Sequence, residues 1–363
     1  MNRAPWQAAS NILCVRLDSL GDVLMCTPAM RAIRQARPRA CLTLLSSASG
    51  AAAAPYIPEL DAVLAYPAPW MKSSAPAAAQ QDAQMIAQLA SGQFDAAVIF
   101  TSFSQSALPA ALLCHLAGIP ARLAHSRENP YRLLTEWIAE PEPDKLVRHE
   151  VRRQLDLVAS LGWTPDSAQL SFAVPEIDIG TAKRLLAAQG IGAREPYVLM
   201  HPGASAASRR YPPLLWAQVI RELGRRSPCP VVLTGEAAEA GMIDTILEAS
   251  GRPVHSLAGQ LGLGQLGAAI AGASVVVSNN TGPAHMAAAL GTPLVDLYAL
   301  TNPQHTPWQV NSRLLFHDVP CKFCYRSVCP QGHHDCLSKL APSRVVQAIC
   351  SLMGQLDADN VRP

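Results

Sequence analysis

The chain has 363 residues, of which 49% are hydrophobic and only 15% charged, so a disordered, charge-solvated chain is excluded and two domains with large cores are expected. Its 29 Lys and Arg residues nearly balance 27 Asp and Glu residues, and a net charge of +2 provides no general field for binding nucleic acid. The longest apolar stretches, such as residues 268–277, are shorter than the ~18 to 20 residues that span a bilayer. With no recognisable secretory signal, the sequence predicts a cytoplasmic protein.

Short apolar segments alternate with longer helical patterns in the first half of the chain. A first helix ends before Pro38, a second covers residues 83–89, and the Ala- and Pro-rich residues 67–79 between them are predicted to form a surface loop. This alternation is typical of parallel βαβ units. The predicted strands are residues 12–17, 42–45 and 96–100.

The second half repeats this alternation and ends in an amphipathic helix over residues 343–353. We therefore predict two doubly wound α/β domains that face across a cleft, with ligands at the carboxyl ends of the strands. The predicted strands are residues 197–200, 230–233, 274–277 and 293–298, and the helices are residues 181–189, 214–223 and 286–290. The predicted domains are residues 1–177, residues 178–342, and residues 343–363 as a final helix with a frayed tail.

The first predicted strand runs into the residues Arg-Leu-Asp-Ser-Leu-Gly-Asp at positions 16–22. Asp22 thus lies at a strand-to-helix turn, where a side chain faces ligands. Gly21 permits a close backbone approach or a positive φ, and the helix N-terminus offers N–H groups to an anion. The alternative is that Asp22 or Ser19 only caps the helix.

Small residues and arginines crowd a second turn, His-Pro-Gly-Ala-Ser-Ala-Ala-Ser-Arg-Arg-Tyr-Pro-Pro at residues 201–213. Its backbone N–H groups, the Ser205 hydroxyl and a guanidinium could hold a pyrophosphate, because Arg forms bidentate bonds with phosphate oxygens. The alternative is an ordinary loop with solvated arginines.

A third polar turn, Ser-Asn-Asn-Thr-Gly-Pro-Ala-His at residues 278–285, also follows a predicted strand. Asn amides and the Thr hydroxyl can pair with sugar hydroxyls and phosphate oxygens, and glycine lets a ligand come close. Glu239 could accept ribose hydroxyls or could simply be solvated. The candidate residues of this turn are Asn280, Thr281, Gly282 and His285.

Four cysteines cluster as Cys321-x2-Cys324-x4-Cys329-x6-Cys336 within residues 317–336. Four thiolates could complete a tetrahedral zinc site, but this spacing is not that of a standard zinc finger. We expect a compact loop of reduced or conditionally paired thiols close to residues 301–305, with structural zinc as the alternative.

Three stretches of this chain resemble glycosyltransferase family 9, the ADP-heptose:lipopolysaccharide heptosyltransferases. They are residues 12–23 with Thr27-Pro28, residues 201–213, and residues 278–293, in the family's order. The resemblance implies a GT-B fold, in which two Rossmann-like domains face across a cleft with the acceptor on the first and the nucleotide-sugar on the second.

The same resemblance implies an inverting transfer of heptose from ADP-L-glycero-D-manno-heptose, with Asp22 as general base and Ser19 and Gly21 in the acceptor-side loop. It places Ser205 and Arg209 on the diphosphate of the donor, so that neither a cofactor nor a metal is required. The donor-binding residues it implies are Ser205, Arg209, Glu239, Asn280, Thr281, Gly282 and His285.

The acceptor implied by the resemblance is lipid A–Kdo or the inner core of lipopolysaccharide, at the cytosolic face of the inner membrane. We expect transient peripheral contact through Arg127, Arg132 and Trp137, and a final helix that packs back on the first domain. The sequence leaves the oligomeric state open.

Two residues depart from the family's pattern. Asn280 stands where the family often has Asp, and Arg209 stands where it commonly has Lys, a change that keeps the charge but alters its reach. Two alternatives therefore remain: a GT-B transferase with another nucleotide-sugar donor, or a catalytically degenerate protein that binds a glycan or a partner.

Overall fold

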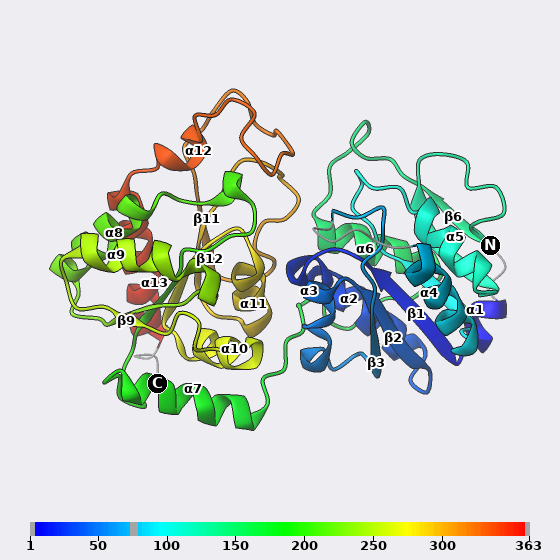
Figure 1. The fold of residues 1–363 in the computed structure, drawn as a ribbon, viewed down its shortest axis with the longest axis horizontal. Coiled ribbons are helices and arrows are strands. Elements are labelled where there is room, and N and C mark those ends of the chain that lie inside the picture. Colours follow the sequence, from blue (N-terminus) through cyan, green and yellow to red (C-terminus); the bar gives the residue numbers. More distant parts are fainter. Residues whose placement is uncertain (1–3, 73–78, 360–363) are drawn as a thin grey trace. The chain divides into compact units, whose positions relative to one another are not determined.

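The computed structural model describes residues 4–72 and 79–359 and divides into two compact units, Met1–Ser171 and Phe172–Pro363 (Figure 1). Each unit contains a parallel six-stranded sheet with helices on both faces. The predicted fold class, two doubly wound α/β domains, is confirmed for each unit. The part of the predicted loop at residues 73–78 lies outside the described residues.

The first sheet has the strand order β3-β2-β1-β4-β5-β6. Its strands are β1 (Asn11–Arg16), β2 (Cys41–Ser46), β3 (Ala62–Ala65), β4 (Ala96–Ile99), β5 (Ala121–Ser126) and β6 (Glu136–Ala139). Its helices are α1 (Ala4–Ala8), α2 (Leu20–Ala36), α3 (Ala48–Ala51), α4 (Ala79–Ser91), α5 (Leu108–Leu116) and α6 (Glu150–Ala159), with a 3-10 turn η1 (Ala54–Tyr56).

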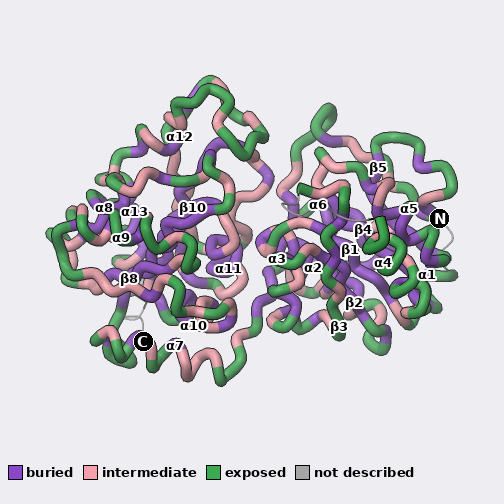
Figure 2. Tube along the Cα trace, in the orientation of Figure 1, coloured by how far each residue is buried: buried purple, intermediate pink, exposed green. Residues whose placement is uncertain are grey.

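Both faces of this sheet are buried, which explains why β1 is an almost unbroken apolar run. Alternate residues point to opposite faces, so Leu13 and Val15 pack against Met85 of α4 and Cys114 of α5. The helices α2 and α6 pack together, on the opposite face (Figure 1). The central strands are accordingly buried along their length (Figure 2).

The second sheet has the strand order β12-β11-β10-β7-β8-β9. Its strands are β7 (Val198–His201), β8 (Val231–Leu233), β9 (His255–Ser256), β10 (Val275–Asn279), β11 (Leu294–Leu297) and β12 (Ser312–Leu315). Its helices are α7 (Glu176–Ala188), α8 (Pro213–Arg226), α9 (Ala240–Ser250), α10 (Leu263–Gly272), α11 (Gly282–Leu290), α12 (Asp335–Ser338) and α13 (Pro342–Asp359), with 3-10 turns η2 (Ala207–Arg209) and η3 (Ala237–Glu239).

The final helix α13 packs into the core of the second unit, and the expectation that it also packs on the first domain stays a prediction. Val345, Val346, Ile349 and Leu352 are fully buried in the core of the second unit, together with residues of α8, β10 and β11. The apolar stripe of α13 is thereby used within its own unit. The helix also continues through Asp359, past the predicted fraying point at Gly354, and residues 360–363 lie outside the described residues.

The chain passes from the first unit to the second between Ser171 and Phe172, six residues before the predicted boundary at residue 177. The reason is a side-chain anchor on α2. Arg31 donates to the backbone oxygens of Ser167 (2.8 Å) and Gln169 (2.7 Å) and to the Ser171 hydroxyl, which holds this segment on the first unit.

None of the helices in the described part of the chain is both long enough and apolar enough to cross a bilayer.

Candidate active site

A buried arginine organises the carboxyl end of β1 in the first unit. The Arg16 side chain is 1% exposed and contacts three carboxylates: Asp18 at 2.8 Å, Asp22 at 3.3 Å and Glu150 at 2.6 Å. Burial alone would lower the pKa of Arg16, but these carboxylates outweigh it and raise the pKa well above its ordinary value. Gln154 donates to the same oxygen of Glu150 (2.7 Å) and fixes the far side of the cluster.

Asp22 lies in the first turn of α2, with its carboxylate held from two sides. Its Oδ1 accepts from the Arg16 guanidinium, and its Oδ2 accepts from the backbone N–H (3.1 Å) and hydroxyl (2.6 Å) of Ser19. The side chain is 18% exposed, so it is partly accessible from outside rather than sealed in an ion pair. Both sequence interpretations, helix capping and a ligand-facing carboxylate, fit this geometry.

Ser19 is the N-cap residue of α2, and Gly21 lies within the first turn of that helix. Gly21 is not among the described residues with positive φ, so of the two possibilities that this glycine offers, a close backbone approach stays as the prediction. The chain enters α2 at Leu20 with ordinary helical geometry, and a cap residue in extended conformation makes the turn instead.

Asp18 is a second carboxylate at this strand end, and the sequence interpretation did not single it out. Its Oδ1 accepts from the Gln105 amide at 2.6 Å, while Arg16 holds its other oxygen. Burial raises the pKa of the Asp18 carboxyl, and the Arg16 charge opposes the rise. The sequence signal was its position two residues after a buried strand.

In the second unit, Asn279 at the end of β10 fixes the turn of residues 202–212. Its amide donates to the Pro202 oxygen (2.7 Å) and its carbonyl accepts from the Tyr211 N–H (3.0 Å), so one buried side chain ties both ends of the turn. Ser208 adds a third anchor by donating its hydroxyl to the Arg326 oxygen (2.9 Å).

Glu239 lies against the same turn, at the end of η3. A Cβ at Gly203 would come 2.1 Å from the Glu239 carboxylate, so a larger residue at this position would displace that side chain. Glu239 also accepts from the Glu236 N–H (3.0 Å). The structure therefore brings the predicted turn at Gly203 and the predicted Glu239 together.

The half-buried Arg209 lies near two buried residues, Asn280 and Asp296 of β11, and the sequence interpretation missed the Asp296 carboxylate. Asp296 is fully buried, and among the described residues neither of its carboxylate oxygens has a hydrogen-bond partner. Burial raises the pKa of Asp296 well above its ordinary value, and the charge of nearby Arg209 opposes the rise. The buried Tyr298 hydroxyl donates to the Asn302 backbone oxygen, and its pKa is influenced by nearby Asp296, Arg209 and Asn280.

The remaining predicted donor residues lie around these anchors with different exposures. Ser205 is exposed on the turn, and Thr281 is the half-buried N-cap of α11. Gly282 opens that helix, and His285 is buried within it. His201, at the end of β7, bonds the Thr234 hydroxyl (3.1 Å), and burial lowers its pKa to about 4.

The cysteine loop packs beside Thr301, as the sequence predicted, because the Tyr325 N–H donates to the Thr301 oxygen at 2.7 Å. All four clustered cysteines are free thiols and half-buried. Across the residues that the structure describes, no three or more His, Cys, Asp or Glu side chains are placed to hold a metal ion. The four are Cys321, Cys324, Cys329 and Cys336.

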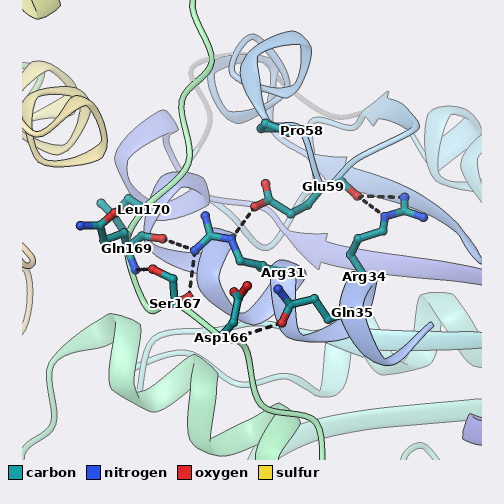
Figure 3. A pocket seen from close by; sticks show the side chains of 9 residues that line it. All are labelled: Arg31, Arg34, Gln35, Pro58, Glu59, Asp166, Ser167, Gln169 and Leu170. Atoms are coloured by element: carbon teal, nitrogen blue, oxygen red, sulfur yellow. Dashed lines mark hydrogen bonds and ion pairs between the residues drawn. The ribbon is translucent and has the colours of Figure 1, made fainter. Parts of the chain in front are cut away.

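A polar cavity of about 510 Å³ lies between α2 and the segment before Ser171 (Figure 3). The charged side chains that line it form hydrogen bonds and ion pairs with other protein groups. Arg31 contacts Glu59 at 3.0 Å, and Arg34 donates to the Glu59 backbone oxygen at 3.0 Å. Arg31 and Arg34 both donate to protein oxygens already. We therefore interpret these arginines as anchors of the segment before Ser171 and not as an anion site.

Comparison with known proteins identifies the family. Residues 83–334 match the model of glycosyltransferase family 9 (heptosyltransferase). Lipopolysaccharide heptosyltransferase 2 of Escherichia coli (strain K12) is 24% identical over 96% of this chain and 99% of its own length. Lipooligosaccharide heptosyltransferase 2 of Campylobacter jejuni is 27% identical over 42% of this chain, a match that spans only 50% of that relative.

Two solved structures share the fold. The glycosyl transferase family 9 structure from Veillonella parvula has a TM-score of 0.81 at 21% identity and covers 95% of this chain and 98% of its own. E. coli heptosyltransferase WaaC with ADP has a TM-score of 0.67 at 21% identity and covers 94% and 99%. These likenesses confirm the predicted GT-B fold class, and the family match covers most of the chain. The chain therefore belongs to glycosyltransferase family 9 and is a glycosyltransferase.

Proposed function

We propose that this protein transfers heptose, with inversion, from ADP-L-glycero-D-manno-heptose to the inner core of lipopolysaccharide, with Asp22 as general base. The names of its relatives, lipopolysaccharide and lipooligosaccharide heptosyltransferases, support this substrate class. The observation that carries the proposal is the Asp22 carboxylate, oriented by Arg16 and Ser19 at a strand-to-helix turn and 18% exposed.

In the proposed step the acceptor hydroxyl oxygen attacks the anomeric carbon of the donor as its proton passes to Asp22. The bond from that carbon to the diphosphate oxygen breaks, and its electron pair leaves with ADP. A single displacement inverts the configuration. The Arg16 guanidinium stabilises negative charge on Asp22, and the Ser19 bonds fix the direction in which its oxygens point.

The second unit is proposed to stabilise the departing diphosphate. Arg209, Ser205 and the backbone N–H groups of the 202–212 turn supply positive charge and donors, and this set is proposed to act without a metal or cofactor. Glu239, Asn280, Thr281, Gly282 and His285 are proposed to contact the nucleoside and sugar. Asn279 acts through the turn that it anchors and is a positioning residue.

The direct test is to incubate the protein with ADP-heptose and a series of truncated lipopolysaccharides, and to weigh the products by mass spectrometry. We expect the mass of one acceptor to increase by one heptose residue, with release of ADP. Donor consumption without any change in acceptor mass would contradict transfer.

We also propose transient contact with the cytosolic face of the inner membrane, where a lipid-linked acceptor is available. Trp137 of β6 is 45% exposed, and Tyr131 (84% exposed) and Arg132 are exposed next to each other in the preceding loop, a combination suited to a headgroup interface. Arg127 is engaged with the backbone oxygens of Phe103 (2.6 Å) and Glu142 (2.8 Å). Flotation with acceptor-containing liposomes should recover the protein, and a Trp137→Ala variant should be recovered less.

One observation favours a second candidate, transfer from another nucleotide-sugar. Asn280 is 2% exposed and neutral where the family often has a carboxylate. Thermal unfolding with ADP, UDP and GDP separates the candidates, because a nucleotide that binds the folded state raises the melting temperature. We expect ADP to protect, and protection by UDP or GDP alone would favour the second candidate.

A further inference from the structure

A second cavity, of about 360 Å³, lies in the first unit at the carboxyl ends of the neighbouring strands β1 and β4. Open α/β sheets bind ligands at this edge, and the volume falls in the range of small-ligand sites, roughly 300 to 1,000 Å³. Its polar and aromatic lining includes Asp18, Trp70, Phe100, Thr101, Ser104 and Gln105.

The lining combines a flat apolar wall with converging polar groups. Trp70 is half-buried and held edge-on by Tyr66, with ring centroids 5.8 Å apart. Facing groups include the Asp18 carboxylate, which accepts from the Gln105 amide at 2.6 Å, and the Ser104 hydroxyl. A sugar ring has an apolar C–H face and a rim of hydroxyls, so this mixture suits a sugar.

The charge around the cavity is negative. Asp18 is the one ionisable side chain among the described residues that line it. Two buried guanidinium groups lie behind this lining. Arg16 pairs with Asp18, Asp22 and Glu150, and Arg153 donates to the Thr101 oxygen and pairs with Glu140. Both cations are thus occupied by carboxylates, and neither of them lines the cavity. A ligand carboxylate or phosphate would meet repulsion here, whereas neutral hydroxyls can donate to Asp18 and accept from Gln105.

We infer that this cavity binds the terminal sugar of the acceptor, and that this sugar is a neutral polyol ring such as heptose rather than an acidic sugar such as Kdo. Asp18 and Gln105 determine this specificity. Because Asp18 and Asp22 share Arg16, a ring held by Asp18 lies beside the proposed base. The inference rests on the proposed function and adds the class of acceptor.

The test compares three glycosides with the same aglycone: one that ends in heptose, one that ends in Kdo, and the methyl ester of the Kdo glycoside. Binding to the full-length protein is measured by ligand-observed NMR without donor, and kcat/KM is measured with ADP-heptose. We expect the heptoside to bind roughly tenfold or more tightly than the Kdo glycoside, and to have a kcat/KM higher by a similar factor. Both ratios would follow from charge repulsion between the site and the Kdo carboxylate. The ester, which lacks the negative charge, should bind better than the Kdo glycoside.

Two variants test the residues. Gln105→Lys places a cation against Asp18 and should narrow the preference for heptoside over the Kdo glycoside by roughly tenfold. Asp18→Asn should raise KM for the heptoside while the Kd for ADP stays unchanged. Asp144→Asn, which removes an exposed carboxylate of the same unit outside the cavity, should leave binding, KM and the Kd for ADP as in the parent.

The outcomes separate the inference from the proposed function. Equal or tighter binding of the Kdo glycoside, or no binding of the heptoside, overturns the inference whether or not transfer occurs. The same holds if the ester binds no better than the Kdo glycoside. By contrast, failure to bind ADP and to transfer to any acceptor counts against the proposed function, and the glycoside-binding comparison in the parent protein still decides the inference.

Discussion

At the scale of single residues, Asp22 shows how one geometry serves two roles. Its Oδ2 bonds to Ser19 are those of a helix cap, and its Oδ1 contact with Arg16 orients and charges the same carboxylate. A cap and a base that also caps require the same placement, a carboxylate oxygen in the first turn of a helix. The test is a change that keeps the two cap bonds from Ser19 and removes the basic carboxylate, at the cost of the contact with Arg16, which retains Asp18 and Glu150.

Asp22→Asn is that change, because the Asn side-chain oxygen can still accept from Ser19. We expect the rate of transfer to fall by roughly 10²-fold or more, while the Kd for ADP and the melting temperature stay close to those of the parent. Ser19→Ala removes a cap hydroxyl and keeps the Asp22 carboxylate. It should lower the free energy of unfolding by about 1 kcal/mol and reduce the rate of transfer less than Asp22→Asn does. Initial rates, calorimetry and thermal unfolding measure these quantities, and equal activity of Asp22→Asn and the parent would rule out the base.

Asp296 provides a second prediction at this scale, in the pH dependence of stability. Its pKa in the folded protein is raised well above the ordinary 3.8, so the folded state holds a proton that the unfolded state releases. Its contribution to stability is present below about pH 3.8 and is lost as pH rises toward the raised folded pKa. Burial without hydrogen-bond partners among the described residues is the main cause.

Asp296→Asn should therefore stabilise the protein at pH 7, because the amide stays neutral without taking up a proton. The difference from the parent should shrink toward pH 4. Denaturant unfolding between pH 4 and pH 8 measures both curves. If Asp296 is instead an ionised partner of Arg209, the variant will be less stable than the parent at pH 7.

At the scale of elements, the donor-side turn of residues 202–212 depends on a neighbouring strand for its shape. Its regular structure is the short η2, and Asn279 of β10 ties its start to its end. Gly203 lets the backbone pass against Glu239. Such a turn can present N–H groups to a diphosphate only while these contacts hold it.

Asn279→Ala should loosen this turn. The Pro202 oxygen and the Tyr211 N–H would each lose a partner, at a cost of about 1 to 3 kcal/mol for a buried group. We expect a lower melting temperature and weaker ADP binding by calorimetry. Asn129→Ala, an exposed asparagine of the first unit that accepts from the Tyr131 N–H, is the control and should leave ADP binding unchanged. If Asn279→Ala binds ADP as tightly as the parent, the shape of the 202–212 turn does not contribute to donor binding.

At the scale of the whole molecule, the chain forms two units that have separate cores and carry different sets of functional groups. The first has carboxylates around one guanidinium, and the second has an arginine, amides and backbone donors at the carboxyl end of its own sheet. This division agrees with the proposed function. Carboxylates on the first unit can accept from the hydroxyls of an acceptor sugar, and the arginine and N–H donors on the second unit can bind a diphosphate.

ADP should therefore protect one unit more than the other. We expect slower amide hydrogen exchange in residues 202–212 and 279–285, with little change at β1 and the start of α2. At an ADP concentration of about 100 Kd, binding should add roughly 2.7 kcal/mol to the stability of the unit that holds it. Hydrogen-exchange mass spectrometry measures this pattern, and protection confined to the first unit would contradict the assignment.

Several features followed from local pattern. The strands β1, β2, β4, β7, β8, β10 and β11 were predicted within one or two residues at most ends, because strands buried on both faces are continuous apolar runs. The edge strands β3, β6, β9 and β12 were missed, since they are short or partly exposed and lack that signal. The buried interior strand β5 was also missed, because Arg122 and His125 interrupt its apolar run. The helix α6 was missed because it buries Glu150 and Arg153, charged residues that local pattern assigns to a surface.

By itself the sequence determined the alternation of strands and helices in each half of the chain and the three polar turns at strand ends. Both features are encoded by residues close together in the chain. Only the tertiary structure decided that Arg16 meets Glu150, that Asp296 lies near Arg209, and that α13 packs within the second unit. Each of these depends on residues far apart in sequence. Their energies come from burial and from pairing of charge, which exist only once the sheets have assembled.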